Sequence, residues 1–173
     1  PDGFKMTIHG PNDRYINDAK IAEALAQMLN RVGIDASVET MPKAVYFKRA
    51  SRGGPNKSPE FSFMLLGWGA GSGEASSPLK ALLHTYDKSK GLGAANRGRH
   101  TDAEVDALIK KALATVDADA RGKLLAEATE KAVGENYGVI PMHYQVNTWA
   151  AKAGYKYLPR TDERTIVTGL SGS

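Results

Sequence analysis

The spacing of apolar residues changes along the chain, and the changes predict where strands and helices lie. Residues 4–9 and residues 34–39 alternate between apolar and polar side chains, which is typical of half-buried strands. Between them, apolar residues recur at helical spacing and predict a helix with one buried stripe: Ile21, Leu25, Met28, Leu29 and Val32. The helical segment ends at Gly33, a residue that suits a left-handed helix cap. Strand, helix and strand at this spacing predict a βαβ unit with two parallel strands.

The segment from Phe61 to Glu74, FSFMLLGWGAGSGE, stands out from the rest of the pattern. Its apolar run predicts a strand that is buried on both faces. Alternating glycines follow, with Trp68 at the junction, and glycines after a strand allow a close approach of the backbone to a bound molecule. We therefore predict a buried strand that delivers a ligand-binding loop.

Helix signals dominate the next part of the chain. Ser77 and Pro78 suit the start of one helix, the run Thr101–Glu104 forms a capping box for a second, and Asp119 can cap a third. A glycine-rich, basic loop is expected between the first two helices. Residues 139–144 predict a short edge strand, because Pro141 interrupts the apolar run.

The pattern weakens from Gln145 onward, where little apolar surface is available for burial. A compact domain does not carry such a tail without a reason. We expect residues 1–144 to form one α/β lobe and residues 145–173 to form a tail that crosses toward another lobe. Trp149 is predicted to anchor this tail between lobes, with ordinary core packing as the alternative.

Composition limits the possible classes of protein. The 173 residues suit one domain or one large lobe, and no apolar run approaches the roughly 18 residues of a membrane span. The chain begins at Pro1 with no secretory signal, which we interpret as a piece of a longer protein. Cysteine is absent, so disulfides, thiolate catalysis and cysteine-ligated metals are excluded.

The charge pattern favours a solvated basic surface. The net charge is +4, but the basic residues form only loose groups and no aromatic ladder lies among them. Nucleic-acid binding is therefore an alternative that rests on charge alone, and we expect no nucleic-acid partner. The four histidines show no ligand spacing, so no metal site is expected.

Nothing in the sequence has the residue order of a known catalytic apparatus, so neither a catalytic residue nor a cofactor is predicted. The carboxylates Asp102, Glu104 and Asp106 stand at one helix start and are interpreted as cap and dipole residues. One enzyme alternative remains. Residues 65–73 resemble the first motif of S-adenosylmethionine-dependent methyltransferases, although Gly67 stands where that family has an acidic residue and the segment downstream is a loop.

Several weak motifs occur together in one order: GFKMTIHG, DAKIAEALAQMLNRVGIDASVE, FSFMLLGWGAG, Asn96 before TDAEVDALIKKAL, the Asp117 to Arg121 spacing in DADARGKLL, and YGVIPMHYQ. In this order, over nearly the whole chain, the sequence resembles the C-terminal lobe of the peptide/nickel class of ABC-transporter substrate-binding proteins. That class includes dipeptide-, oligopeptide- and nickel-binding receptors. The resemblance implies an α/β fold: one lobe of a periplasmic-binding-protein-like fold, with a mixed, partly parallel sheet and helices on both faces.

The resemblance also implies a function. The complete receptor would be the extracytoplasmic solute-binding component of an ABC importer, closing two lobes on a peptide or similar small solute. It would work in the periplasm or at the outer face of the cell membrane, without being embedded in it, and would hand the solute to the membrane permease.

Family members commonly carry a Trp-x-x-Asp motif at the glycine loop, in which the tryptophan lines the cavity and the aspartate meets the peptide amino group. Trp68 matches the tryptophan, whereas Gly71 occupies the aspartate position, and we hypothesise that Glu74 supplies the missing carboxylate. Each candidate has a structural alternative: core packing for Trp68, a turn for Ser72 and loop bonding for Asn96. The predicted ligand-binding residues are Trp68, Gly69, Ala70, Gly71, Ser72, Glu74 and Asn96.

Overall fold

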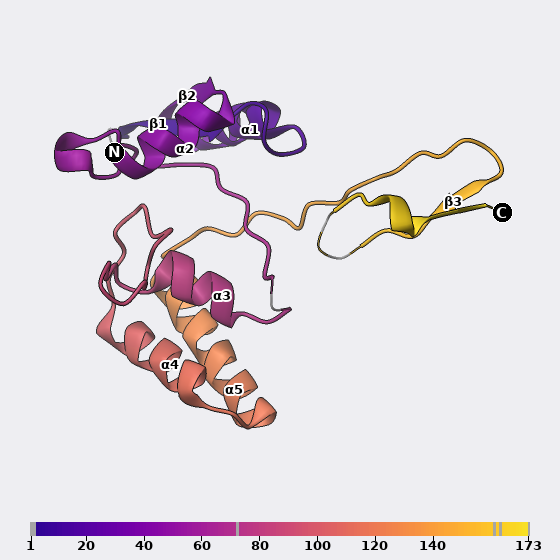
Figure 1. The fold of residues 1–173 in the computed structure, drawn as a ribbon. Coiled ribbons are helices and arrows are strands. Elements are labelled where there is room, and N and C mark those ends of the chain that lie inside the picture. Colours follow the sequence, from indigo (N-terminus) through magenta and orange to yellow (C-terminus); the bar gives the residue numbers. More distant parts are fainter. Residues whose placement is uncertain (1–2, 72, 161, 163, 173) are drawn as a thin grey trace. The chain divides into compact units, whose positions relative to one another are not determined.

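The structure is a computed structural model that describes residues 3–71, 73–160, 162 and 164–172. Contacts between residues divide the chain into unit 1, Pro1–Ile140, and unit 2, Pro141–Ser173, and each unit is described by itself (Figure 1). The boundary predicted after residue 144 separates this lobe from a segment that crosses toward a second lobe. It stays a prediction.

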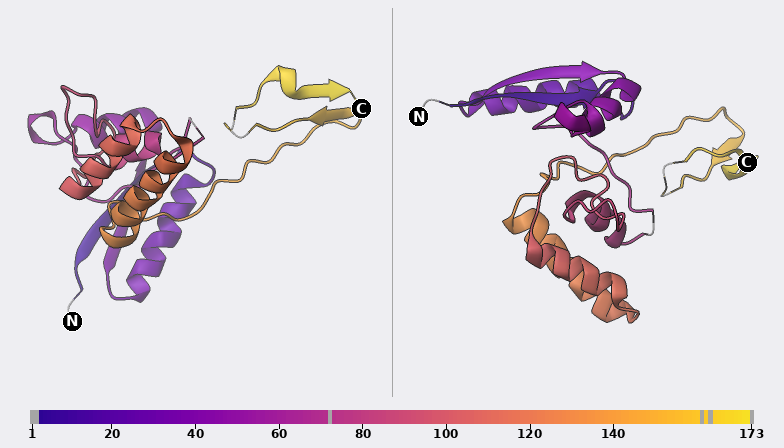
Figure 2. Two further views of the ribbon diagram at one scale, coloured as in Figure 1. Left: turned by 90° about the horizontal axis from the view of Figure 1, so that it is seen from below. Right: turned by 60° about the vertical axis from the view of Figure 1, so that its left-hand side comes forward.

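A βαβ unit opens unit 1, as the apolar spacing predicted. Strand β1 (Lys5–Pro11) leads into helix α1 (Asp18–Arg31), which returns the chain to strand β2 (Asp35–Met41). The two strands are parallel and lie side by side in Figure 2, with a register that runs from Lys5 opposite Asp35 to Pro11 opposite Met41. Gly33 ends the helical segment with a φ of 88°, which a residue with a side chain rarely adopts.

Helices cover both faces of this parallel pair. One face packs on α1 through an apolar cluster of Ile8, Ala22, Ala26 and Ala36. The other face packs on helix α2 (Lys43–Arg52) through Met41, Tyr46, Ala50 and Phe61. Because alternate residues of a strand point to opposite faces, Ala36 and Met41 of β2 serve different clusters. The predicted α/β fold with helices on both faces is confirmed.

Part of the stripe predicted for α1 is wrong. Met28 and Val32 were expected inside, but they are 59% and 73% exposed. The buried positions of this helix are instead the small residues Ala22 and Ala26. Small side chains allow the helix to lie close to the strands, so the apolar residues one turn away point toward solvent.

The segment before the glycine loop is extended but does not form a named strand. Its only ladder contact is a parallel bridge between Met64 and His9, held by hydrogen bonds from His9 N to Phe63 O (3.0 Å) and from Leu65 N to His9 O (2.8 Å). Phe61 and Leu65 are buried, as predicted. The pairing stops at Leu65 because the glycines that follow disfavour strand geometry.

The second half of unit 1 is helical. Helix α3 (Ser76–Pro78) continues into a π-helical turn, η2 (Leu79–Leu83), and helix α5 (Ala118–Thr129) continues into another, η3 (Glu130–Glu135). Helix α4 (Ala103–Ala114) lies beside α5 (Figure 1). The buried residues of this cluster are Leu79, Leu83, Val105, Ile109, Ala112, Leu125, Ala128 and Ala132.

Two helix caps differ from the sequence prediction by two residues or fewer. Asp102, rather than Thr101, is the N-cap of α4, and its carboxylate accepts from the backbone N–H groups of Glu104 and Val105 at 2.8 and 2.9 Å. Asp117, rather than Asp119, is the N-cap of α5. At each helix start, two residues that can act as N-caps lie within two positions of one another. The residue directly before the first helical residue becomes the N-cap.

Unit 2 is a short antiparallel pair, β3 (Tyr155–Tyr157) with β4 (Leu170–Gly172), joined through the single turn η4 (Val167–Gly169). The antiparallel strands therefore form a sheet of their own, separate from the parallel pair. The strand predicted for residues 139–144 is wrong. No neighbouring strand pairs with this segment among the described residues, and Ile140 and Tyr144 are exposed.

Candidate functional site

The carboxyl ends of three parallel segments meet at one edge of the small sheet. Strands β1 and β2 end at Pro11 and Met41, and the segment that bridges His9 at Met64 runs in the same direction. The loops that leave this edge are residues 12–17, the start of α2, and the glycine loop of residues 67–74. In open α/β sheets, ligands bind outside the carboxyl ends of the strands, so this edge is the candidate site.

The glycine loop presents Trp68 and open backbone. Trp68 is 45% exposed, which excludes the alternative of a tryptophan packed in the core. The space where a Cβ would lie is empty at both Gly69 and Gly71. Ala70 is also exposed, and its carbonyl accepts from Gly73 N at 2.9 Å in a turn. The loop therefore offers an aromatic ring beside accessible backbone groups.

Tyr46 of α2 fixes the end of the segment that precedes this loop. Its side chain is fully buried, and its hydroxyl donates to the carbonyl of Leu65 at 2.7 Å. Burial raises the pKa of Tyr46, so the hydroxyl remains a donor at neutral pH. The carbonyl of Leu65 thus has a hydrogen-bond partner at the point where the chain leaves the sheet and leads to Trp68.

The loop after β1 brings two residues to the same edge that sequence reasoning missed. The hydroxyl of Tyr15 donates to the carbonyl of Gly67 at 3.2 Å, although the two residues lie 52 positions apart. The guanidinium carbon of Arg14 lies 4.9 Å from the centre of the Tyr15 ring. The turn Gly10-Pro11-Asn12-Asp13 was the available signal, because it places the following residues at the end of a strand.

The predicted carboxylate ligand, Glu74, is engaged inside unit 1. It forms an ion pair with Arg121, whose Nε and Nη2 both lie 3.3 Å from its oxygens, and it accepts a hydrogen bond from the Ser76 hydroxyl. Arg121 also donates to the carbonyl of Ala112 at 2.9 Å. These contacts favour a structural role, in which Glu74 ties the start of α3 to the helices α4 and α5.

Asn96 is 3% exposed and makes a clamp within its own loop. Its amide nitrogen donates to the carbonyls of His84 (3.0 Å) and His100 (2.7 Å), and its amide oxygen accepts from His100 N (3.0 Å). Both amide hydrogens are thus committed, which favours the structural alternative. Ser72, the remaining predicted site residue, lies outside the described residues.

The chain is similar in sequence and in fold to known proteins. No family model matches the chain. Over 112 residues it is 28% identical to heme-binding protein A of Haemophilus influenzae, covering 65% of this chain and 19% of that protein. Its fold superposes on HbpA2 of Haemophilus parasuis with a TM-score of 0.75 at 22% identity, covering 100% of this chain and 33% of the other.

A second structure supports the same fold. The chain is 25% identical to DppA of Helicobacter pylori, an ABC transporter-associated periplasmic binding protein solved with the peptide STSA, with a TM-score of 0.62 over 75% of this chain and 23% of that one. This chain has the fold of the peptide/nickel class of ABC-transporter substrate-binding proteins. The chain spans about a third or less of the length of these proteins, as a lobe fragment does.

The enzyme alternative lacks structural support. The substrate-binding proteins compared above are binding proteins by name, not enzymes. A methyltransferase motif needs a further strand after the next helix, and residues 84–101 hold no named strand within the described ranges. The first helix after the glycine loop, α3, has three residues before its π-helical turn.

The described residues hold neither a metal-binding cluster nor a membrane-spanning helix. No group of three or more histidine, cysteine, aspartate or glutamate side chains is placed to hold a metal ion there. No helix in that part of the chain is long and apolar enough to cross a bilayer.

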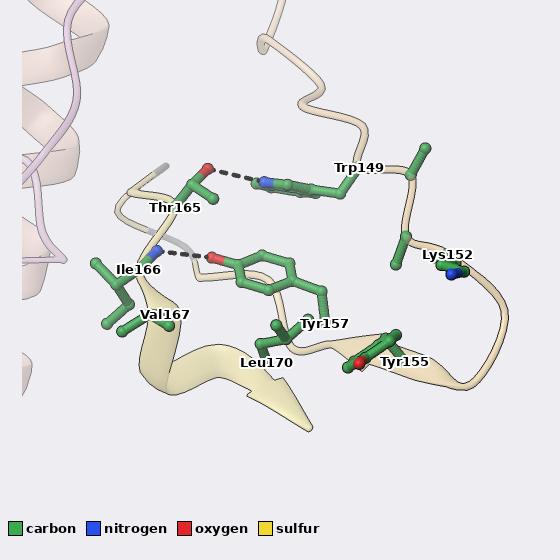
Figure 3. Close-up of a pocket in the computed structure, with 10 residues that line it drawn as sticks. Trp149, Lys152, Tyr155, Tyr157, Thr165, Ile166, Val167 and Leu170 are labelled. Carbon is green, nitrogen blue, oxygen red and sulfur yellow. Dashed lines mark hydrogen bonds between the residues drawn. The ribbon is translucent and has the colours of Figure 1, made fainter. Parts of the chain in front are cut away.

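Unit 2 has a hollow of its own, shown in Figure 3. Its volume is about 540 Å³, and its walls are mainly aromatic and aliphatic, with Trp149, Tyr155, Tyr157 and Leu170 among them. Trp149 Nε1 donates to the Thr165 hydroxyl at 2.9 Å, and the Tyr157 hydroxyl accepts from Ile166 N at 3.1 Å. These two bonds close the antiparallel segment around an apolar surface.

Proposed function

We propose that this chain is part of one lobe of a two-lobed solute receptor, which captures a peptide or similar small solute for an ABC importer. The receptor works outside the cytoplasm, and the membrane permease is its partner. The observation that carries the proposal is the exposed Trp68 beside the open backbone of Gly69 and Gly71, at the carboxyl edge of a parallel sheet. The relative DppA, which bound a peptide, supports the choice of solute.

The loop chemistry suits an extended solute. Trp68 offers a flat apolar surface, and exposed backbone groups at residues 69–71 can hydrogen-bond to the backbone of a peptide. Arg14 adds a cation at the same edge. It forms no ion pair with the described residues, so a solute with a negative group gains an electrostatic contact there.

The tail belongs to the same proposal. Residues 145–173 cross toward the second lobe, and Trp149 anchors them there. The support is that unit 2 holds no buried apolar side chain among its described residues, while its aromatic hollow is open. Such a small segment gains stability by covering the surface of a larger body.

Tryptophan fluorescence tests the proposed function. The full-length receptor carrying Trp149→Phe is titrated with short peptides, with hemin because one relative is named a heme-binding protein, and with S-adenosylmethionine. We expect saturable quenching by a peptide or hemin. Isothermal titration calorimetry, which needs no fluorescent residue, should show loss of that binding in Trp68→Ala. Binding of S-adenosylmethionine alone would favour the methyltransferase, and no binding by any peptide or by hemin would contradict the proposal.

A further inference from the structure

The ring of Tyr15 fills the space that a side chain at Gly67 would need. A Cβ built on Gly67 would lie 2.7 Å from Cε1 of Tyr15, 3.1 Å from Cδ1 and 3.2 Å from Cζ. Real Cβ atoms do not approach carbon this closely, so the ring and the loop backbone are in contact only because residue 67 is glycine. The hydroxyl of the same ring holds the carbonyl of Gly67 at 3.2 Å.

Tyr15 is itself held by a buried carboxylate. Asp18 is 4% exposed and accepts from the backbone N–H groups of Arg14 and Tyr15 at 2.9 and 3.0 Å. Asn17, which lies between Tyr15 and Asp18 in the sequence, has a φ of 57°, a left-handed conformation that asparagine tolerates better than most residues. The loop after β1 is therefore fixed by its own hydrogen bonds, and the Tyr15 ring has a defined direction.

We propose that Tyr15 is a positioning residue for the solute-binding loop: by holding Gly67 it sets the direction of Trp68, the next residue in the chain. This inference rests on the proposed function, in which Trp68 contacts the solute. Loops 12–17 and 67–71 then act as one binding surface, although they come from distant parts of the sequence. A solute that orders Trp68 also orders the loop after β1.

Trp68 fluorescence tests the coupling without any ligand. The chain has two tryptophans, so a Trp149→Phe background leaves Trp68 as the only reporter. We expect Gly67→Ala to shift the emission maximum and increase quenching by acrylamide when Tyr15 is present. In a Tyr15→Ala background, where the ring is gone, the same Gly67→Ala change should have no further effect.

Gly98→Ala is the matched control, because Gly98 lies outside the proposed binding loops. Its Cβ would enter open space, and its φ lies outside the left-handed region, so we expect emission and quenching as in the parent. Equal effects of Gly67→Ala with and without the Tyr15 ring would overturn the inference. So would an unchanged emission and quenching in Gly67→Ala, because the loop would then not depend on the ring.

A second readout separates positioning from simple stability. Tyr15→Phe keeps the ring and removes the hydrogen bond to Gly67, and in the full-length receptor we expect its dissociation constant for the bound peptide to rise about two- to tenfold. That factor corresponds to the net value of one hydrogen bond, about 0.5–1.5 kcal/mol. A lower unfolding midpoint with an unchanged dissociation constant would show a structural role only. If neither a peptide nor hemin binds, the proposed function fails, while the fluorescence result still decides the coupling.

Discussion

At the residue scale, Glu74 and Arg121 form an ion pair whose contribution to the free energy of unfolding can be measured by single substitutions. Their side chains are 33% and 27% exposed, so solvent weakens the pair. We expect Glu74→Gln to lower the free energy of unfolding by about 0.2–1 kcal/mol, measured by urea denaturation. Since the carboxylate is engaged by Arg121 and Ser76, we expect little change in solute affinity.

The matched control is Arg121→Gln, which removes the other half of the pair. The double variant should lose less stability than the sum of the two single losses, because each single change already breaks the pair. A large loss of solute affinity in Glu74→Gln, with stability retained, would instead support the hypothesis that Glu74 is the ligand carboxylate.

A second residue-scale prediction concerns Arg49, which lies between two carboxylates. It contacts Glu39 at 2.6 Å through Nη1 and donates from Nε to Glu60 at 3.0 Å. Hydrogen bonds from Arg49 lower the pKa of both glutamates below the ordinary 4.5. A carboxylate whose pKa is lowered by folding stabilises the fold above its unfolded pKa, and the contribution is lost as the pH falls.

We therefore expect the urea midpoint to decrease as the pH falls below about 4.5, and to decrease less steeply in Arg49→Gln. Arg52→Gln is the control, because Arg52 is exposed on the same helix and forms no ion pair with the described residues. Parallel pH profiles for the parent and Arg49→Gln would contradict the assignment.

At the residue scale, the sequence predicted the glycine loop at residues 67–71 with Trp68 at its start, but not all of the neighbours of that loop. Trp68 and its glycines could be predicted because a run of apolar residues before alternating glycines is a local pattern. Tyr15 could not, since its contact with Gly67 depends on which strands become neighbours. The roles suggested for Glu74 and Asn96 came from family resemblance, and their engagement by Arg121, His84 and His100 is a three-dimensional fact.

At the scale of elements, the cap of α4 offers a clean test of how this helix begins. The carboxylate of Asp102 accepts two backbone N–H groups of the first turn, and it also accepts from the Asn136 amide at 2.6 Å. We expect Asp102→Ala to cost about 0.5–2 kcal/mol of unfolding free energy. Thr101→Ala, one residue earlier, should cost little because Thr101 is exposed and is not the cap.

Chemical denaturation of both variants gives the comparison. A larger loss of unfolding free energy in Thr101→Ala than in Asp102→Ala would support the capping box that the sequence predicted. Equal losses would mean that the start of α4 is held by packing of Val105 and Ile109 rather than by its cap.

Helices were predicted better than strands in this chain for a physical reason. A helix satisfies its backbone within one segment, so the spacing in residues 103–114 was sufficient evidence. A strand needs a partner that the local sequence does not reveal. Among the described residues, the segment 61–66 pairs with a neighbouring strand only at Met64, and the apolar run near Pro141 pairs with no strand.

At the scale of the whole molecule, the two units differ in what stabilises them. Every buried apolar residue in the described ranges belongs to unit 1, and the described side chains of unit 2 are all at least partly exposed. Segments of fewer than about 40 residues usually need a disulfide, a metal or a partner surface, and the chain has no cysteine. Unit 2 is therefore expected to be the less stable of the two.

Hydrogen exchange measures this difference directly. We expect slow exchange for amides in α1, α4 and α5 of the isolated chain, and fast exchange for the described residues of the segment 145–172. If the second lobe covers the tail as proposed, exchange in this segment should become slower in the full-length receptor, and Trp149→Ala should reverse part of that protection. Thr165→Ala is the control for Trp149→Ala, because it removes the hydrogen bond to the indole but keeps the ring. Equal protection of the tail in the isolated chain and the full-length receptor would contradict the proposed crossover, because unit 2 would then be stable without the surface of another lobe.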